Sequence, residues 1–236
     1  MKNQLLKFGR GNKKLAGYIT TFSLPAGHTC PQALECQSKA PKNGVGKIQD
    51  GPNCQFRCFA ASQERMYPNV RKARWYNLNL LKRLSIESMV DLIEWSIPKS
   101  LYVRIHVSGD FYNQKYFLAW CEVAKRNPRT IFYAYTKSIS LWQDNLEFVP
   151  NNLRLTASLG GKEDNLALEL GLKTAYVVFS KAQAKAMNLE IDYDDSLAYS
   201  ESNESFALLL YGTQPKGSEA SKALSEIKKQ KRLELV

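Results

Sequence analysis

The sequence predicts an α/β protein in which parallel strands are joined in βα units, preceded by an irregular segment that carries cysteines. Three observations lead to this fold class. The 236 residues are 44% hydrophobic, which is enough for a real core. Beyond about residue 100, short apolar runs of strand length alternate with stretches of helical periodicity. The stretch from Cys30 to Cys58 is rich in Gly, Pro, Asn and Lys and has neither period.

The domain organisation follows from the same pattern. We expect a single domain over residues 1–236, with a metal-binding N-terminal segment at 1–60 and an α/β scaffold at 61–236. The sequence contains no run of 18 or more apolar residues, so no membrane span is expected. Its first residues are basic but lack the apolar core of a secretory signal, which predicts a protein of the reducing cytosol.

The elements before residue 100 are a strand, a turn and three helices. A short β-rich run predicts a strand over 17–22, and Pro25-Ala26-Gly27-His28 predicts a turn. Helices are expected over 60–66 and 70–81, on either side of Pro68. A third helix begins after Ser85, which suits an N-cap, and ends at Pro98.

The remainder of the chain alternates regularly between strands and helices. The predicted strands are 101–107, 130–135, 153–157, 175–179 and 206–211. The predicted helices are 114–125, 139–146, 165–170, 181–187 and 218–229. Such alternation is compatible with an open parallel sheet or a partial (β/α) barrel, and we favour the barrel-like form. In both architectures ligands bind at the carboxyl ends of the strands.

The net charge of +11 is distributed unevenly. Residues 1–100 carry 16 Lys and Arg residues against 6 Asp and Glu residues, whereas residues 101–236 carry 17 against 16. The basic character therefore belongs to the half that holds the cysteine-rich segment. It indicates either a surface for nucleic acid or a counter-charge to an anionic cluster and its partners.

Four of the five cysteines, Cys30, Cys36, Cys54 and Cys58, are clustered in the irregular segment, and we expect them to form one metal site. The first pair is separated by five residues and the last pair by three, so neither is a regular zinc knuckle. Iron–sulfur clusters tolerate looser spacings. The sequence therefore favours an iron–sulfur cluster, of the 4Fe-4S type, over zinc as second choice and over unliganded thiols.

The number of ligating thiolates determines what such a cluster can do. If all four cysteines bind iron, no iron is left for a substrate, and the cluster transfers electrons, senses redox state or stabilises the fold. If one of them is not a ligand, an open iron is available for Lewis-acid or radical chemistry.

Polar residues at the predicted strand ends are the other candidates for a site. Alternation along a strand puts Arg104, His106 and Ser108 on one face, where they would contact an anion or the cluster. Asp110 follows at the strand end as an acid/base or hydrogen-bond acceptor, and Lys137 follows the next strand. We assign His106 and Asp110 to catalysis and Arg104, Ser108 and Lys137 to cofactor binding. A buried, mutually satisfied structural network is the alternative.

Several short segments support a family resemblance. They are Cys30-Pro31, Cys58-Phe59-Ala60-Ala61, the Arg-x-His-x-Ser-Gly-Asp-Phe run at 104–111, Trp120, and Tyr135-Thr136-Lys137-Ser138. In these the chain resembles the phage-encoded gene product 88 family, over about residues 30–180. The resemblance implies a phage or phage-derived protein with a cysteine-bound cluster, located in the host cytoplasm. Relatives often carry a further cysteine-rich segment near the C-terminus, which residues 208–218 lack, so no second metal site is expected.

These observations together predict a phage iron–sulfur protein that transfers electrons or senses redox state. The alternative is a cluster-dependent enzyme or a nucleic-acid-binding protein that acts on an anionic substrate and is related to radical S-adenosylmethionine barrels. A redox partner and nucleic acid, bound through the basic N-terminal half, are the expected partners.

Overall fold

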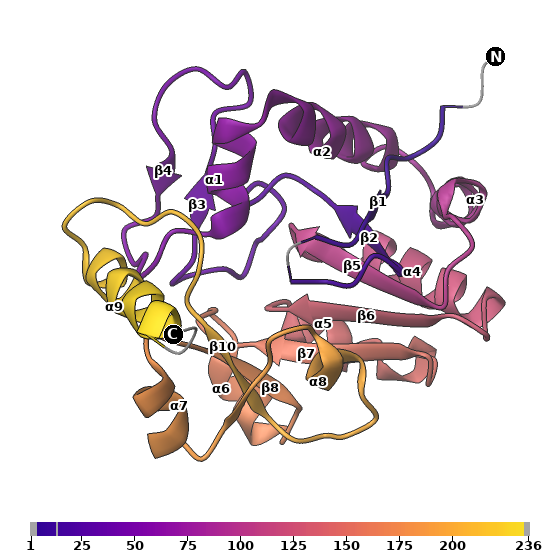
Figure 1. The fold of residues 1–236 in the computed structure, drawn as a ribbon. Coiled ribbons are helices and arrows are strands. Elements are labelled where there is room, and N and C mark those ends of the chain that lie inside the picture. The colour runs from indigo at the N-terminus through magenta and orange to yellow at the C-terminus, as the bar shows by residue number, and fades with distance from the viewer. Residues whose placement is uncertain (1–3, 13, 234–236) are drawn as a thin grey trace.

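The computed structural model describes residues 4–12 and 14–233. Its main element is an eight-stranded sheet with the order β1-β2-β5-β6-β7-β8-β10-β9 (Figure 1). Within the described residues, β1 is antiparallel to β2 and every other neighbouring pair is parallel. A separate two-stranded ribbon, β3 and β4, lies in the cysteine-bearing segment.

The strands and helices have the following bounds. The strands are β1 (Gly9–Arg10), β2 (Ile19–Ser23), β3 (Ser38–Lys39), β4 (Gln49–Asp50), β5 (Tyr102–Ser108), β6 (Ile131–Thr136), β7 (Leu153–Ser158), β8 (Thr174–Val178), β9 (Glu190–Ile191) and β10 (Phe206–Leu209). The helices are α1 (Phe59–Met66), α2 (Pro68–Leu81), α3 (Ile86–Ser96), α4 (Gln114–Arg126), α5 (Ile139–Gln143), α6 (Asp164–Glu169), α7 (Lys181–Ala186), α8 (Ser196–Tyr199) and α9 (Glu219–Leu233).

The predicted alternation of strands and helices is confirmed beyond residue 100. Boundaries differ locally: the helix expected over 139–146 divides into α5 and a 3-10 turn at Leu146–Phe148. The short elements β9 and α8 were not predicted, because two to four residues are too few to show a period. The cap at Ser85 is also confirmed, since its side chain accepts the backbone amide of Ser88.

The sheet is open. From β2 to β8 the strands follow one another in chain order without reversal, and in the described residues no strand pair joins the edge strands β1 and β9. The mixed α/β class with a mostly parallel sheet is therefore confirmed, and the sheet does not form a closed barrel.

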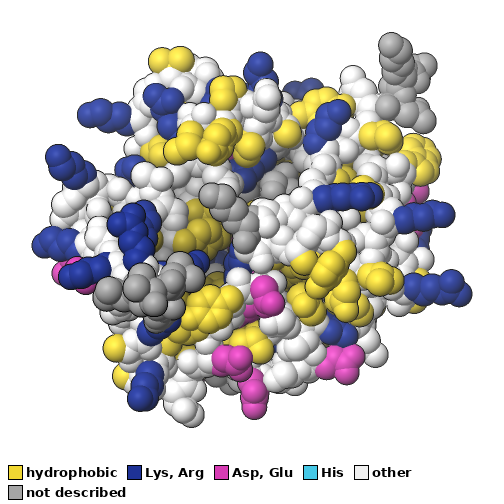
Figure 2. Space-filling view, viewed as in Figure 1, with side chains coloured by type: hydrophobic (Ala, Val, Ile, Leu, Met, Phe, Trp, Pro, Cys, Tyr) yellow, Lys and Arg dark blue, Asp and Glu magenta, His cyan; other side chains and the backbone are white. Residues whose placement is uncertain are grey.

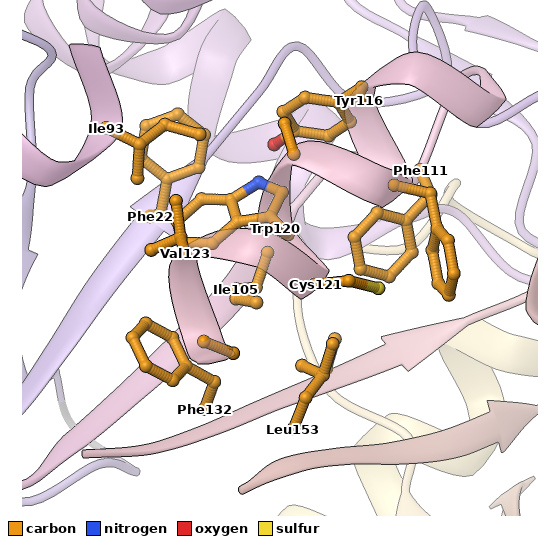
Figure 3. Close-up of a cluster of buried hydrophobic side chains, with 14 of the residues drawn as sticks. Phe22, Ile93, Ile105, Phe111, Tyr116, Trp120, Cys121, Val123, Phe132 and Leu153 are labelled. Carbon is orange, nitrogen blue, oxygen red and sulfur yellow. The ribbon is translucent and has the colours of Figure 1, made fainter. Parts of the chain in front are cut away.

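Apolar side chains pack on both faces of the sheet. Phe132 and Ala134 of β6 lie in the larger cluster, which includes residues of α3 and α4. Trp120 of α4 is fully buried there, and its ring centroid lies 5.5 Å from that of Phe22 (Figure 3). Tyr133, which alternates with these β6 residues, belongs to a second cluster with residues of α8 and β10. The two clusters hold helices against both faces of the sheet.

The surface is charged unevenly, as the sequence predicts. Figure 2 shows Lys and Arg side chains over the upper, left and right parts of this face, and Asp and Glu side chains mainly in its lower part. In the part of the chain that the structure describes, no helix is both long enough and apolar enough to cross a membrane.

Candidate functional site

Backbone hydrogen bonds and the side chain of Gln214 fix the Cys30–Cys58 segment against loops at the carboxyl ends of the strands. The amides of Leu34 and Glu35 donate to the carbonyl of Gly160, just after β7, at 3.2 and 2.9 Å. Gln214, after β10, accepts the amide of Arg57 at 2.8 Å and donates to its carbonyl at 3.2 Å. The segment therefore spans the ends of strands that are far from it in the sequence.

A cavity of about 160 Å³ lies between this segment and the strand ends. At about 10–15 Å³ per water molecule, it has room for a small ligand or a compact cofactor. Its lining includes three of the four clustered cysteines and all five predicted strand-end residues: Cys30, Cys36, Cys58, Arg104, His106, Ser108, Asp110 and Lys137. Its location at the carboxyl ends is the one predicted for a ligand site in a parallel sheet.

The three thiols in this lining affect one another's ionisation, as close neighbours do. Burial raises the pKa of Cys30, and the charges of Asp110, Cys58 and Cys36 raise it further. Burial and the neighbouring Cys36 also raise the pKa of Cys58 to about 12, while the amides at the start of α1 act in the opposite direction. These sulfurs are therefore neutral thiols at pH 7 unless a metal displaces their protons.

Burial raises the pKa of Cys54, and the charge of Cys36 is among those that raise it further, so this thiol is a neighbour of the group. It is not among the cavity-lining residues, and its Sγ donates to the carbonyl of Phe56 at 3.1 Å. A second contact joins its Sγ to the hydroxyl of Ser38 at 3.7 Å. All five cysteines are free thiols, and Cys121 is buried in the large apolar cluster.

The donor set consists of thiols, which both zinc ions and iron–sulfur clusters take as ligands. Among the described residues, no group of three or more His, Cys, Asp and Glu side chains is arranged to hold one metal ion. A zinc ion requires four ligands around one point, and the cysteines are not gathered in that way. Iron–sulfur clusters are held by thiolates, and their irons lie at separate corners. Thiols spread around a cavity are therefore of the ligand type that such a cluster takes.

Asp110 and Lys137 connect the ends of three strands. One carboxyl oxygen of Asp110 accepts the Thr136 hydroxyl at 2.7 Å, and the other accepts the Lys137 amide at 2.8 Å. Lys137 Nζ then donates to the carbonyl of Ser158 at 2.6 Å. Burial raises the pKa of Asp110 to about 6, against the hydrogen bonds that favour its charged form. Both side chains thus have structural partners while they line the cavity.

Arg104 has the buried partner that its position requires. It forms an ion pair with Asp195, and its guanidinium lies over the ring of Tyr135 at 4.7 Å. Lys14 joins the same carboxylate at 2.6 Å. Burial opposes the charge of Arg104, but Asp195 raises its pKa above the usual value. This arrangement agrees with the alternative interpretation of Arg104, in which it belongs to a buried and mutually satisfied structural network.

The prediction that Arg104, His106 and Ser108 share one face of β5 is wrong. His106 has a φ of 66°, which interrupts the strand alternation. Its Nε2 meets the Tyr116 hydroxyl of α4 at 2.9 Å, and its Nδ1 is buried with no hydrogen-bond partner among the described residues. Ile105 packs in the larger apolar cluster, on the α4 face of the sheet, whereas Val107 packs against the second cluster, on the opposite face. Residues two apart in β5 therefore no longer point to the same face at this place.

Ser108 and several residues that the sequence did not single out hold the loops around the cavity. The Ser108 hydroxyl donates to the carbonyl of Leu24 at 2.7 Å. Glu64 is fully buried, accepts the amide of Ala26 at 2.8 Å and pairs with Arg74 at 2.9 Å. A buried carboxylate on a helix gives no periodic signal, so only the fold identifies it.

Comparison with known proteins gives a family match over nearly the whole chain. The model of the family described as Gene product 88 matches residues 2–230. The Gene 88 protein of Mycobacterium phage L5 is 25% identical over 196 residues, and that of Mycobacterium phage D29 is 24% identical over 200 residues. Each match covers 75% of this chain and 73% of the relative. No solved structure matches the chain. These relatives support the expected phage origin.

Proposed function

The chain belongs to the gene product 88 family, and we propose that it binds an iron–sulfur cluster, of the 4Fe-4S type, beside the cavity at the strand ends. One observation carries the proposal: Cys30, Cys36 and Cys58, from the two ends of a long loop, line the same cavity. Thiolates are soft ligands that suit iron–sulfur clusters.

The surroundings of the cavity favour a cluster-dependent enzyme that acts on a small polar substrate. Such a cluster supplies either electrons or an open iron to a molecule bound next to it. Asp110, Lys137 and Ser158 bring polar groups to the lining, and the side chains of Val177 and Leu208 make part of it apolar. Polar groups on an apolar background orient a small ligand. The sequential parallel strands from β2 to β8 also favour a partial (β/α) barrel, an architecture with its active site at this end.

Electron transfer or redox sensing is the second candidate, and the basic surface of the cysteine-bearing half supports it. Lys42, Lys47, Arg65 and Lys72 are exposed on or near the segment that carries the thiols. A positive surface of this kind steers an acidic redox partner toward the cluster. Nucleic acid is the other polyanion that this surface would attract, with an affinity that falls steeply as salt is raised.

Anaerobic purification followed by metal and sulfide analysis tests the proposal. We expect a brown protein that contains iron and acid-labile sulfide. A colourless protein that holds zinc, or one that takes up no metal after incubation with ferrous iron and sulfide, would overturn it. Salt-dependent binding of reduced flavodoxin, an acidic electron carrier, would favour the second candidate over the first.

A further inference from the structure

The ion pair of Arg104 with Asp195 leaves part of the Arg104 guanidinium unused. Nη1 donates to the carboxylate, whereas Nε is buried and has no hydrogen-bond partner among the described residues. In any guanidinium, Nε and Nη2 form an edge with two parallel N–H donors, and this edge matches the two oxygens of a carboxylate. Because a buried donor without a partner is unfavourable, an acceptor supplied by a ligand would stabilise this side chain.

This side chain is part of the cavity lining. Arg104 is 9% exposed and lines the cavity together with Tyr135, whose ring lies 4.7 Å from the guanidinium carbon. Its carboxylate partner, Asp195, is not part of the lining. The cavity therefore meets the cation but not its counter-charge. The ion pair and the ring contact hold the guanidinium in place, which lowers the entropy lost when a ligand binds.

The other charged side chains of the lining are two cations and one carboxylate, namely Arg57, Lys137 and Asp110. Arg57 is paired with Asp50, which lies outside the lining. Lys137 is 8% exposed, and its Nζ donates to the carbonyl and the hydroxyl of Ser158. None of the ion pairs between described residues includes Lys137. Three cations and one carboxylate thus surround the cavity, which favours an anionic ligand.

Apolar side chains make up much of the remaining lining. The rings of Phe59 and Tyr211 have centroids 4.5 Å apart, and Val177, Leu208 and Leu210 also line the cavity. A polar group that is fixed by a few side chains on an apolar background is the usual pattern of a site for a small molecule. The ligand that suits this lining combines one anionic group with an apolar body.

We propose that the cavity binds a small carboxylic acid with an apolar body, whose carboxylate is held by the Nε–Nη2 edge of Arg104. The apolar body packs against Leu208 and the rings of Phe59 and Tyr211. The proposal rests on the substrate site proposed above and names the class of molecule that it takes. It gives Arg104 a second role, since the same guanidinium also pairs with Asp195.

Ligand binding to the unaltered full-length chain tests the proposal without any substitution. The probes are phenylacetate and hexanoate, and each is compared with its neutral amide, phenylacetamide or hexanamide. Isothermal titration calorimetry in about 150 mM sodium chloride, which screens non-specific attraction to the basic surface, measures the dissociation constants. We expect saturable binding of the carboxylates with one molecule per chain. The amides should bind about tenfold more weakly or worse, because they lack the charge that strengthens the hydrogen bonds to Arg104.

Two arginine variants locate the binding site. Arg104→Lys keeps a positive charge beside Asp195 but removes the planar edge, so it should raise the dissociation constants of the carboxylates about tenfold or more. Arg154→Lys is the matched control, since Arg154 is also paired with a carboxylate, that of Glu201, but does not line the cavity. It should bind the carboxylates as the unaltered chain does. Circular dichroism identifies a variant that has not folded, and the comparison of acids with amides then decides alone.

The proposal is wrong if neither carboxylate binds, if the acids and amides bind equally, or if the two arginine variants change the affinity alike. The unaltered chain is titrated both as purified and after anaerobic incubation with ferrous iron and sulfide. A chain that takes up neither iron nor sulfide but binds a carboxylate would refute the cluster and support this proposal. A chain that takes up both but binds no carboxylate in either form would refute this proposal and leave the cluster.

Discussion

The carbonyl oxygen of Gly160 accepts the backbone amide of Glu35 at 2.9 Å, which joins the cysteine-bearing loop to the end of β7. Gly160 has a φ of 90°, and a Cβ at this position would lie 2.8 Å from Oε2 of Glu35. Glycine therefore suits this backbone conformation, and any larger residue would also displace the side chain of Glu35.

Gly160→Ala should lower the free energy of unfolding by about 1–3 kcal/mol, because it adds backbone strain and a steric clash. If the loop binds the proposed cluster, the variant should also hold less iron after anaerobic incubation with ferrous iron and sulfide. Urea denaturation and metal analysis measure the two effects. Gly171→Ala is the matched control, since Gly171 has a φ of 60° but no atom within 4 Å of its Cβ position. If both variants lose the same free energy of unfolding, contact with the Glu35 side chain does not contribute to the destabilisation of Gly160→Ala.

Asp195→Asn should destabilise the protein by about 3–5 kcal/mol, because it leaves Arg104 buried without its counter-charge. The Asp195 side chain is fully buried, whereas Asp194 beside it is exposed. Asp194→Asn should therefore have a much smaller effect in the same urea titration. The double variant Arg104→Met with Asp195→Asn should recover part of the loss. If it is no more stable than Asp195→Asn alone, the ion pair is not the cause.

Asp110→Asn should lower the free energy of unfolding by about 1–3 kcal/mol, since an amide NH₂ would oppose one of the donors that the carboxylate now accepts. The donors are the Thr136 hydroxyl and the amides of Phe111 and Lys137. Thermal unfolding compared with Asp144→Asn, at an exposed position, measures this difference. A variant that loses function at unchanged stability would instead indicate a purely chemical role for Asp110.

His106 should make the protein less stable in mild acid. Burial, followed by the nearby charge of Arg104, lowers the pKa of His106 to about 3 in the folded state, whereas an unfolded histidine has a pKa of about 6.5. The unfolded chain thus binds a proton that the folded one excludes, so stability falls as pH drops from about 6.5 toward 3. At pH 5 the loss should be about 2 kcal/mol relative to neutral pH.

The variant His106→Asn isolates this contribution. Asparagine tolerates positive φ and does not titrate, so it retains the backbone conformation of the strand while the proton-linked term disappears. Urea titrations of both proteins at pH 7 and pH 5 provide the comparison. The pH-dependent loss should be smaller in the variant by about 2 kcal/mol. An identical dependence in the two proteins would contradict the assignment to His106.

Local sequence signals were sufficient for most of the secondary structure. The apolar run at 153–157 corresponds to β7, and the periodic stretch at 114–125 corresponds to α4. These predictions hold because strand and helix periods depend on residues close in the chain. The alternation failed at His106, where one positive φ shifts the register, a feature that residue type alone does not reveal.

The candidate site was predicted only in outline. Its position at the strand ends follows from the βα order, and all of the predicted residues except Cys54 line the cavity. Their hydrogen-bond partners were not predictable. The pairing of Arg104 with Asp195 joins residues 91 positions apart, and no local pattern encodes such a contact.

The sequence by itself therefore determined the α/β class through its periods, the family through the resemblance of short motifs, and the four thiols as the prominent chemical feature, because all of these are local properties of the chain. Only the tertiary structure decided which thiols face one cavity. That depends on how a loop without a period of its own is bonded to Gly160 and Gln214, residues that reach it only after the sheet has formed.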